Sequence, residues 1–133
     1  MKRDLSVLAV ACALLVVTAC NPFAPSQRVA LGVSRIDAPA TIAQTTPLTI
    51  ALTVVTGGCR TFERIETQRF VTGASITVWG RDAAVGRDVA CPTDIRYESH
   101  TVTFDPPFPP SSSFQISVNQ GRLAPITATV QVQ

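Results

Sequence analysis

The sequence predicts an all-β fold: a single antiparallel sandwich of about seven strands that follows a cleaved signal segment. Three observations predict it. Apolar residues alternate with polar ones at a period of two, turn-forming residues interrupt this alternation at regular intervals, and no stretch reads as a long helix. Charged residues make up only 15% of the 133 residues and hydrophobic residues make up 46%, so the chain can bury a core and forms one domain.

The two clearest strands are apolar on one face and polar on the other. Residues 126–132 place Ile126, Ala128 and Val130 between threonines and a glutamine, and residues 48–55 repeat the pattern after Pro47. Threonine suits the solvent face of a strand because its branched Cβ packs well on a pleated surface. The other predicted strands are residues 29–36, 62–71, 76–79, 101–104 and 114–118.

Four segments define the order of turns and strands along the chain: residues 36–39 (Ile-Asp-Ala-Pro), the strand over 47–55, the strand over 114–119 and the closing strand from Ile126. This order resembles the immunoglobulin-like domains that bacteria place on secreted and surface proteins. The resemblance covers most of residues 29–133 and implies an immunoglobulin-like sandwich there. Antibody-type domains bridge two facing strands with cysteines. Here Cys59 ends a strand and Cys91 precedes Pro92 in an irregular stretch.

The first 19 residues have the features of a signal peptide. A short basic start is followed by about 13 mostly apolar residues over 5–17, whereas a membrane-spanning helix needs about 20. The run ends in Val17-Thr18-Ala19-Cys20, which resembles the bacterial lipobox. The resemblance implies cleavage between Ala19 and Cys20 and lipidation of Cys20, and residues 20–28 then form the lipidated cysteine and an extended tether. An ordinary secretory signal that happens to contain Cys20 is the alternative.

A lipidated Cys20 implies a protein held at the bacterial cell envelope through its membrane. Each buried methylene of an acyl chain contributes about 0.8 kcal/mol, so two or three chains make a lasting anchor. Asn21, in the position after the cysteine, favours the outer membrane. Without the signal segment the chain keeps nine arginines, eight acidic residues and no lysine, so we expect no nucleic-acid partner.

Cys59 and Cys91 are the two cysteines of the mature chain besides Cys20. Because exported proteins meet an oxidising compartment, we expect a disulfide between them, which would hold loops or an edge of the sheet and not the core. It would close a loop of roughly 33 residues and stabilise the domain by about 3 to 4 kcal/mol in the chain-entropy model. Free thiols and a metal-binding pair are the competing interpretations.

We expect no metal and no cofactor. The mature chain has one histidine, His100, and no methionine, which excludes a blue-copper site, and no pair of residues has zinc-ligand spacing. Asp82, Asp88 and Asp94 lie in one polar stretch but lack the spacing of a calcium loop, so we interpret them as turn-forming residues.

Catalysis is not expected either. His100 is the only candidate base, and Glu98 can share its side of a strand, but the chain has no Gly-x-Ser-x-Gly elbow. Glu63 and Glu66 stand among arginines, a pattern more typical of a solvated charged face than of paired catalytic carboxylates.

The leading functional hypothesis is a lipid-anchored, non-catalytic binding or structural module, whose partner is another envelope protein or a glycan. Its candidate binding surface consists of an aromatic and proline set, namely Trp79, Phe108, Pro109 and Pro110. In the competing interpretation these rings fill the core. The alternative function is a small cell-surface hydrolase or hydrolase inhibitor that uses His100 or the loop that begins at Pro106 and ends at Ser113. Ligand binding between the sheets is a third hypothesis.

Overall fold

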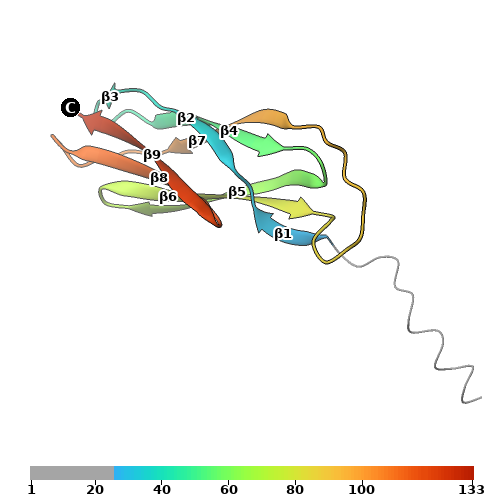
Figure 1. Cartoon of the computed structure of the whole chain (residues 1–133). Helices are drawn as coiled ribbons and strands as arrows, with labels where there is room; N and C mark the ends of the chain where they lie inside the picture. Colours follow the sequence, from blue (N-terminus) through green and yellow to red (C-terminus); the bar gives the residue numbers. More distant parts are fainter. Residues whose placement is uncertain (1–25) are drawn as a thin grey trace, which may run out of the picture.

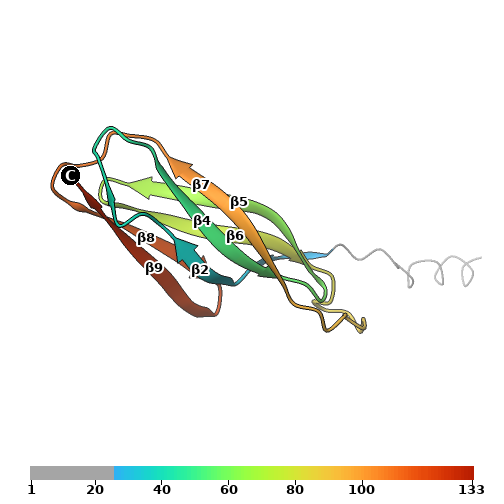
Figure 2. The ribbon, with the colours of Figure 1, turned by 90° about the horizontal axis from the view of Figure 1, so that it is seen from above.

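The computed structural model describes residues 26–133, which form two β-sheets packed face to face (Figures 1 and 2). This confirms the all-β class and the two-layer arrangement. The signal segment, Cys20 and most of the expected tether lie outside the described residues. Within the described part, no helix is long and apolar enough to cross a membrane.

The smaller sheet has three strands in the order β2-β4-β7, and every neighbouring pair in it is antiparallel. Their bounds are β2 (Val33–Asp37), β4 (Leu48–Thr56) and β7 (Arg96–Phe104). The larger sheet has six strands: β1 (Gln27–Ala30), β3 (Thr41–Ile42), β5 (Arg60–Phe70), β6 (Gly73–Asp82), β8 (Ser113–Gln120) and β9 (Leu123–Val132).

Strand β6 organises the larger sheet because it pairs with three strands. It forms an antiparallel pair with β5 along its length. It also pairs with β8 over residues 73–77 and with β1 over residues 79–82. β9 follows beside β8, and the short β3 lies beside β9.

Two details of the predicted sandwich are corrected. The described residues contain nine strands, not about seven, and the larger sheet is mixed, not purely antiparallel, because the β6–β8 and β3–β9 pairs are parallel. The expected strand over 29–36 is divided at Leu31 and Gly32, where the chain passes from the larger sheet to the smaller one. β3 has only two residues, too few for alternation to reveal.

Strand boundaries also differ from the expected ones. β1 begins at Gln27, two residues before the expected start of the domain at Val29. β7 begins at Arg96, five residues before the expected start at Thr101. The inward-facing residues near that end are Glu98 and His100. Both are polar, so the alternation of apolar and polar residues does not reveal this part of the strand.

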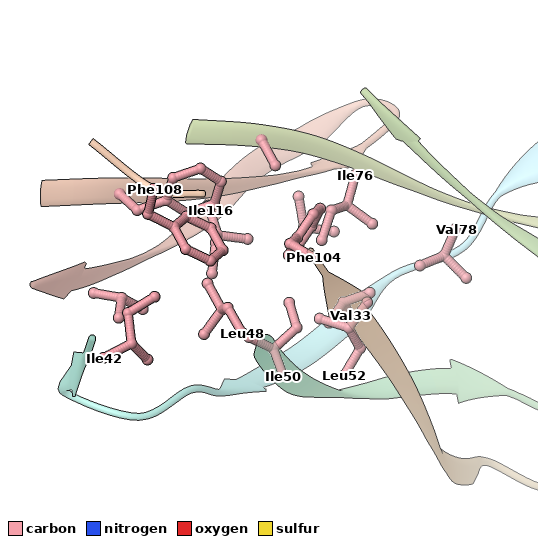
Figure 3. Close-up of a cluster of buried hydrophobic side chains, with 14 of the residues drawn as sticks. Val33, Ile42, Leu48, Ile50, Leu52, Ile76, Val78, Phe104, Phe108 and Ile116 are labelled. Atoms are coloured by element: carbon pink, nitrogen blue, oxygen red, sulfur yellow. The ribbon is translucent and has the colours of Figure 1, made fainter. Parts of the chain in front are cut away.

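The core lies between the sheets and is built from alternate residues of the long strands (Figure 3). β4 shows the predicted pattern clearly, since Leu48, Ile50, Leu52 and Val54 are buried. Burying one such side chain stabilises the fold by about 1.5 to 3 kcal/mol. The remaining fully buried large side chains come from β6, β8, β9 and the β1–β2 junction: Leu31, Ile76, Val78, Phe114, Ile116, Val118 and Val130.

Candidate functional site

The predicted aromatic and proline surface does not form one patch. Phe108 is only 2% exposed, and its ring packs edge-on against Phe114, with centroids 5.2 Å apart. It therefore belongs to the core and is removed from the candidate binding surface. Pro109 is half-buried and Pro110 is exposed.

Arg69 of β5 holds the proline loop over this aromatic cluster. Its guanidinium carbon lies 4.8 Å from the centroid of the Phe108 ring, a cation–π contact. The same guanidinium donates to the carbonyls of Asp105 and Pro107, the latter at 2.8 Å. The loop is thus fixed by a buried ring below and an arginine beside it. In the sequence, Arg69 gave no sign of this role because it lies 36 positions away from Asp105.

Trp79 lies on the outer face of the larger sheet and is half-buried. Its indole Nε1 donates to Glu66 Oε2 at 2.8 Å, and Arg64 of β5 and Ala30 of β1 are its register partners on either side. Trp79 is the one predicted surface residue that lies on a strand of this sheet. Pro109 and Pro110 belong to the loop between β7 and β8. The ring is oriented by its hydrogen bond and flanked by neighbours in the sheet.

Uncharged hydrogen-bonding side chains continue this face across the sheet. Strand register aligns one row over four neighbouring strands, consisting of Gln68, Ser75, Ser117 and Thr127. A second row aligns Gln115 with Thr129. Neighbouring strands lie about 4.8 Å apart, so each row presents hydroxyl and amide groups at that spacing. We call Trp79 and these two rows the sheet platform.

The carboxylates Glu63 and Glu66 border the sheet platform but do not face each other across a cleft. Glu63 accepts hydrogen bonds from Arg28, the shorter at 2.8 Å, and lies 3.5 Å from Arg81. The hydrogen bond from Arg28 lowers the pKa of Glu63 below its ordinary value. Both acids are therefore engaged by arginines or by Trp79, as expected of a solvated charged face.

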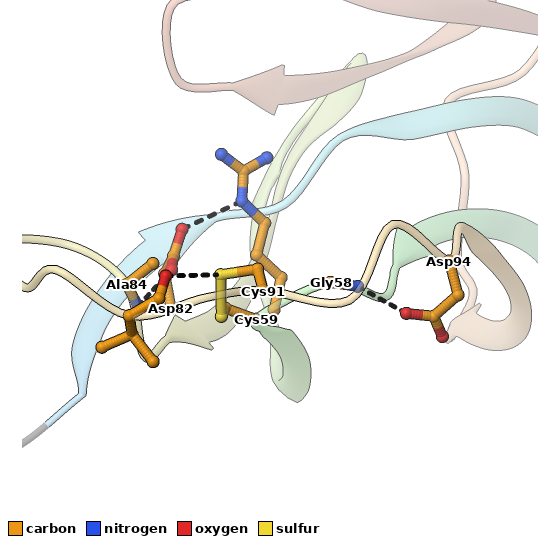
Figure 4. Close-up of a disulfide and its surroundings, with 8 residues drawn as sticks. Gly58, Cys59, Asp82, Ala84, Cys91 and Asp94 are labelled. Carbon is orange, nitrogen blue, oxygen red and sulfur yellow. Dashed lines mark hydrogen bonds and ion pairs between the residues drawn. A yellow bond between two sulfur atoms is a disulfide. The ribbon is translucent and has the colours of Figure 1, made fainter.

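The predicted disulfide between Cys59 and Cys91 is confirmed (Figure 4). Their Cα atoms are 5.2 Å apart, and the bond joins the β4–β5 turn to the long loop between β6 and β7. Cys59 is half-buried and Cys91 is exposed, so the bridge holds loops at the end of the sandwich and leaves the core to the apolar residues.

Polar contacts reinforce this junction. Gly58 N–H donates to Asp94 Oδ1 at 3.1 Å, and Ala83 N–H donates to the Cys59 carbonyl at 3.0 Å. Asp82 is 6% exposed; it accepts from Ala84 N–H at 2.8 Å and pairs with Arg60. The N–H of Ala84 and that of Gly58 lower the pKa values of Asp82 and Asp94, respectively. Both aspartates thus act as loop anchors.

The β4–β5 turn can approach the loop so closely because it contains Gly57 and Gly58. Gly57 has φ +101°, and a Cβ there would lie 2.4 Å from the Asp94 carbonyl oxygen. A side chain at this position is therefore excluded by both backbone conformation and space.

Within residues 26–133, no three metal-ligating side chains gather into a possible metal site.

His100 belongs to a small network at one side of the sandwich. Its Nε2 lies 3.3 Å from Glu98 Oε2, and its ring stacks on Phe62 with centroids 3.8 Å apart. Thr56 donates to Glu98 Oε1 at 2.5 Å, and this hydrogen bond, followed by His100, lowers the pKa of Glu98. Loop 106–113 begins beyond Phe104, about 13 Å along β7 from His100 at the usual rise per residue. The two parts of the hydrolase hypothesis are thus apart.

Two open clefts flank the disulfide end. One, of about 650 Å³, lies beside the β4–β5 turn and is lined by Thr56, Arg60, Phe62 and Glu98 among others. The other, of about 900 Å³, runs past β1 and the β8–β9 turn, and Val29, Val85 and Leu123 contribute to its wall. Residues of both sheets line each of these clefts, so the hypothesis of ligand binding between the sheets applies to either.

Comparisons with protein families, with curated proteins and with solved structures find no match for this chain.

Proposed function

We propose that the mature chain is a lipid-anchored protein of the bacterial cell envelope, on the outer membrane, which acts by binding or structural support and not by catalysis. Its immunoglobulin-like character is part of this proposal. The three-stranded β2-β4-β7 sheet opposite the β8–β9 hairpin supports that class. The parallel β6–β8 pair is a departure from a purely antiparallel sandwich.

The sheet platform is the observation that carries the binding role. It combines one oriented indole ring with rows of hydroxyl and amide groups that bear no charge. Of the two partner classes expected, a neutral glycan suits this face better than a charged protein surface does, because sugar hydroxyls pair with hydroxyl and amide groups and sugar rings stack on an indole.

The test of binding is capture of envelope material by the mature protein. We expect Trp79→Ala to reduce the recovery of a bound glycan about tenfold, which corresponds to about 1.4 kcal/mol of binding free energy. Thr101→Ala is the control, because Thr101 is exposed on β7 in the smaller sheet and does not belong to the sheet platform. Equal recovery by the wild type and both variants would refute the binding role of the platform.

The anchor is tested separately. Metabolic palmitate labelling should mark the wild-type chain and not Cys20→Ser, because the thiol of Cys20 is the proposed attachment atom. Labelling of both chains to the same extent would remove lipidation at Cys20 from the proposal.

A further inference from the structure

Exposed apolar side chains are concentrated in one segment of the described chain. Seven large apolar residues are exposed. Val85, Val89 and Ile95 lie between β6 and β7, and Tyr97 is the second residue of β7. Their exposed fractions are 39%, 45%, 66% and 66%. Single exposed apolar residues are ordinary, but several together mark an interaction surface. We call residues 83–97 the apolar loop.

The N-terminal end of the domain, where β1 begins, lies beside the apolar loop. β1 begins at Gln27, whose register partner is Asp82, the last residue before the loop. Gly86 of the loop is also near Gln27, since a Cβ placed on Gly86 would lie 3.9 Å from Gln27 Nε2. The C-terminus lies at the other end of the molecule (Figure 1).

The distance from this end to Cys20 is limited by chain length. Five residues separate Cys20 from Ser26, the first described residue. Even a fully extended chain over this interval spans only about 20 Å. A lipid anchor on Cys20 would therefore hold the apolar loop close to the bilayer surface.

The side chains of the apolar loop suit the headgroup region of a membrane. Aliphatic groups and a tyrosine ring partition favourably there, and the long stem of Arg87 allows its guanidinium group to reach phosphates. Two of the three acids near this surface are already engaged: Asp82 is buried and paired with Arg60, and Asp94 is paired with Arg96 at 2.7 Å. Negative charge near the lipid is thereby reduced.

We propose that the apolar loop rests in the headgroup region of the membrane that carries the Cys20 anchor, with Val85, Val89 and Tyr97 in contact with lipid. This inference rests on the proposed lipid anchor. The disulfide and the Asp94 hydrogen bond hold the loop in shape before it meets the lipid. The domain then stands with its strands pointing away from the bilayer and the sheet platform facing sideways.

Fluorescence quenching by brominated lipid tests this placement. The mature lipidated protein is reconstituted into phosphatidylethanolamine and phosphatidylglycerol vesicles containing lipid brominated close to the headgroup. Tyr97→Trp in a Trp79→Phe background reports on the apolar loop. Phe70→Trp in the same background is the matched control, because Phe70 is 52% exposed at the β5–β6 turn, at the far end of β6 from Asp82.

An indole inserted about 5 to 10 Å into the headgroup boundary should lose about half of its fluorescence, whereas Phe70→Trp should keep its full signal. Val89→Trp provides a second reporter if Tyr97→Trp does not fold, with folding judged by disulfide mass and cooperative unfolding. Quenching at either loop position supports the placement. If the protein is lipidated and folded but neither loop position is quenched, the placement is overturned. If the mass of the purified protein shows no attached lipid, the proposed anchor itself is overturned.

Discussion

Two long loops connect β7 to the larger sheet, and they differ in the interaction that supplements their hydrogen bonds. The loop before β7, at the disulfide end, exposes its apolar side chains and is held by a covalent bond and by hydrogen bonds from Gly58 and Ala84. The loop after β7 has no covalent bond and instead buries Phe108 beneath Arg69. Hydrogen bonds hold the backbone of both loops, so the loops differ in the additional interaction: a buried ring in the loop that contributes to the core, and a disulfide in the loop that keeps its apolar residues outside.

The largest effect should come from removing the buried ring of the second loop. We expect Phe108→Ala to lower the free energy of unfolding by about 3 to 5 kcal/mol, because it leaves a cavity against Phe114. Urea denaturation measures this loss. Phe70→Ala, at an exposed position, should cost less than about 1 kcal/mol. Similar losses for the two variants would show that Phe108 is not part of the core.

The disulfide of the first loop should come next. Replacing both cysteines, Cys59→Ser with Cys91→Ser, should lower the free energy of unfolding by about 3 to 4 kcal/mol, since the unfolded chain gains the freedom of a closed loop. Urea denaturation of the double variant, and of the wild type with reductant, should give the same midpoint. A double variant as stable as the oxidised wild type would mean that the hydrogen bonds alone hold this loop.

A smaller effect should follow from crowding the glycine turn. Gly57→Ala should cost about 2 to 3 kcal/mol, because the residue has a positive φ and its new Cβ would collide with the Asp94 carbonyl. Gly86→Ala shares the positive φ, but its new Cβ would make only an ordinary contact with Gln27 Nε2, so it should cost only about 1 kcal/mol. Thermal unfolding of the two variants separates steric contact from backbone strain. A smaller loss for Gly57→Ala than for Gly86→Ala would contradict the close packing.

Acid should weaken the first loop by the smallest amount. The pKa of Asp82 lies below its ordinary value of 3.8, first because of the Ala84 N–H and then because of Arg60. A lowered pKa stabilises the fold at higher pH, and this contribution is lost as pH falls below about 4. Asp82→Asn should therefore show a smaller fall in stability between pH 5 and about pH 2.5 than the wild type, measured by urea midpoints. Parallel curves would exclude Asp82 as a source of acid sensitivity.

The strands and the disulfide were predictable because each leaves a local or compositional signature. Alternation marks the inward face of β4, and two cysteines in a chain that is expected to be exported favour a bond. Alternation could not reveal the crossing at Leu31, since Val29, Leu31 and Val33 keep the same period while the chain changes sheets. It could not predict the parallel β6–β8 pair either, because strand order depends on contacts between distant residues.

The candidate site was less predictable for a related reason. In the sequence, Phe108 and Trp79 are both aromatic residues beside an expected turn or strand end. The structure places Trp79 inside β6, and only the packing of other strands makes Phe108 buried and Trp79 half-buried. The rows of the sheet platform depend on strand register, which the sequence of a single strand does not contain.

The pairing of β1 with the C-terminal part of β6 has a mechanical consequence. β1 lies antiparallel to β6 over four residue pairs, and its first residue is at the end of the sheet. Tension applied along the chain from the N-terminal side would pull β1 lengthwise against β6, which strains the cross-strand hydrogen bonds together in shear instead of opening them one after another. A domain tethered from this side would resist pulling through this antiparallel pair of four residues on each strand.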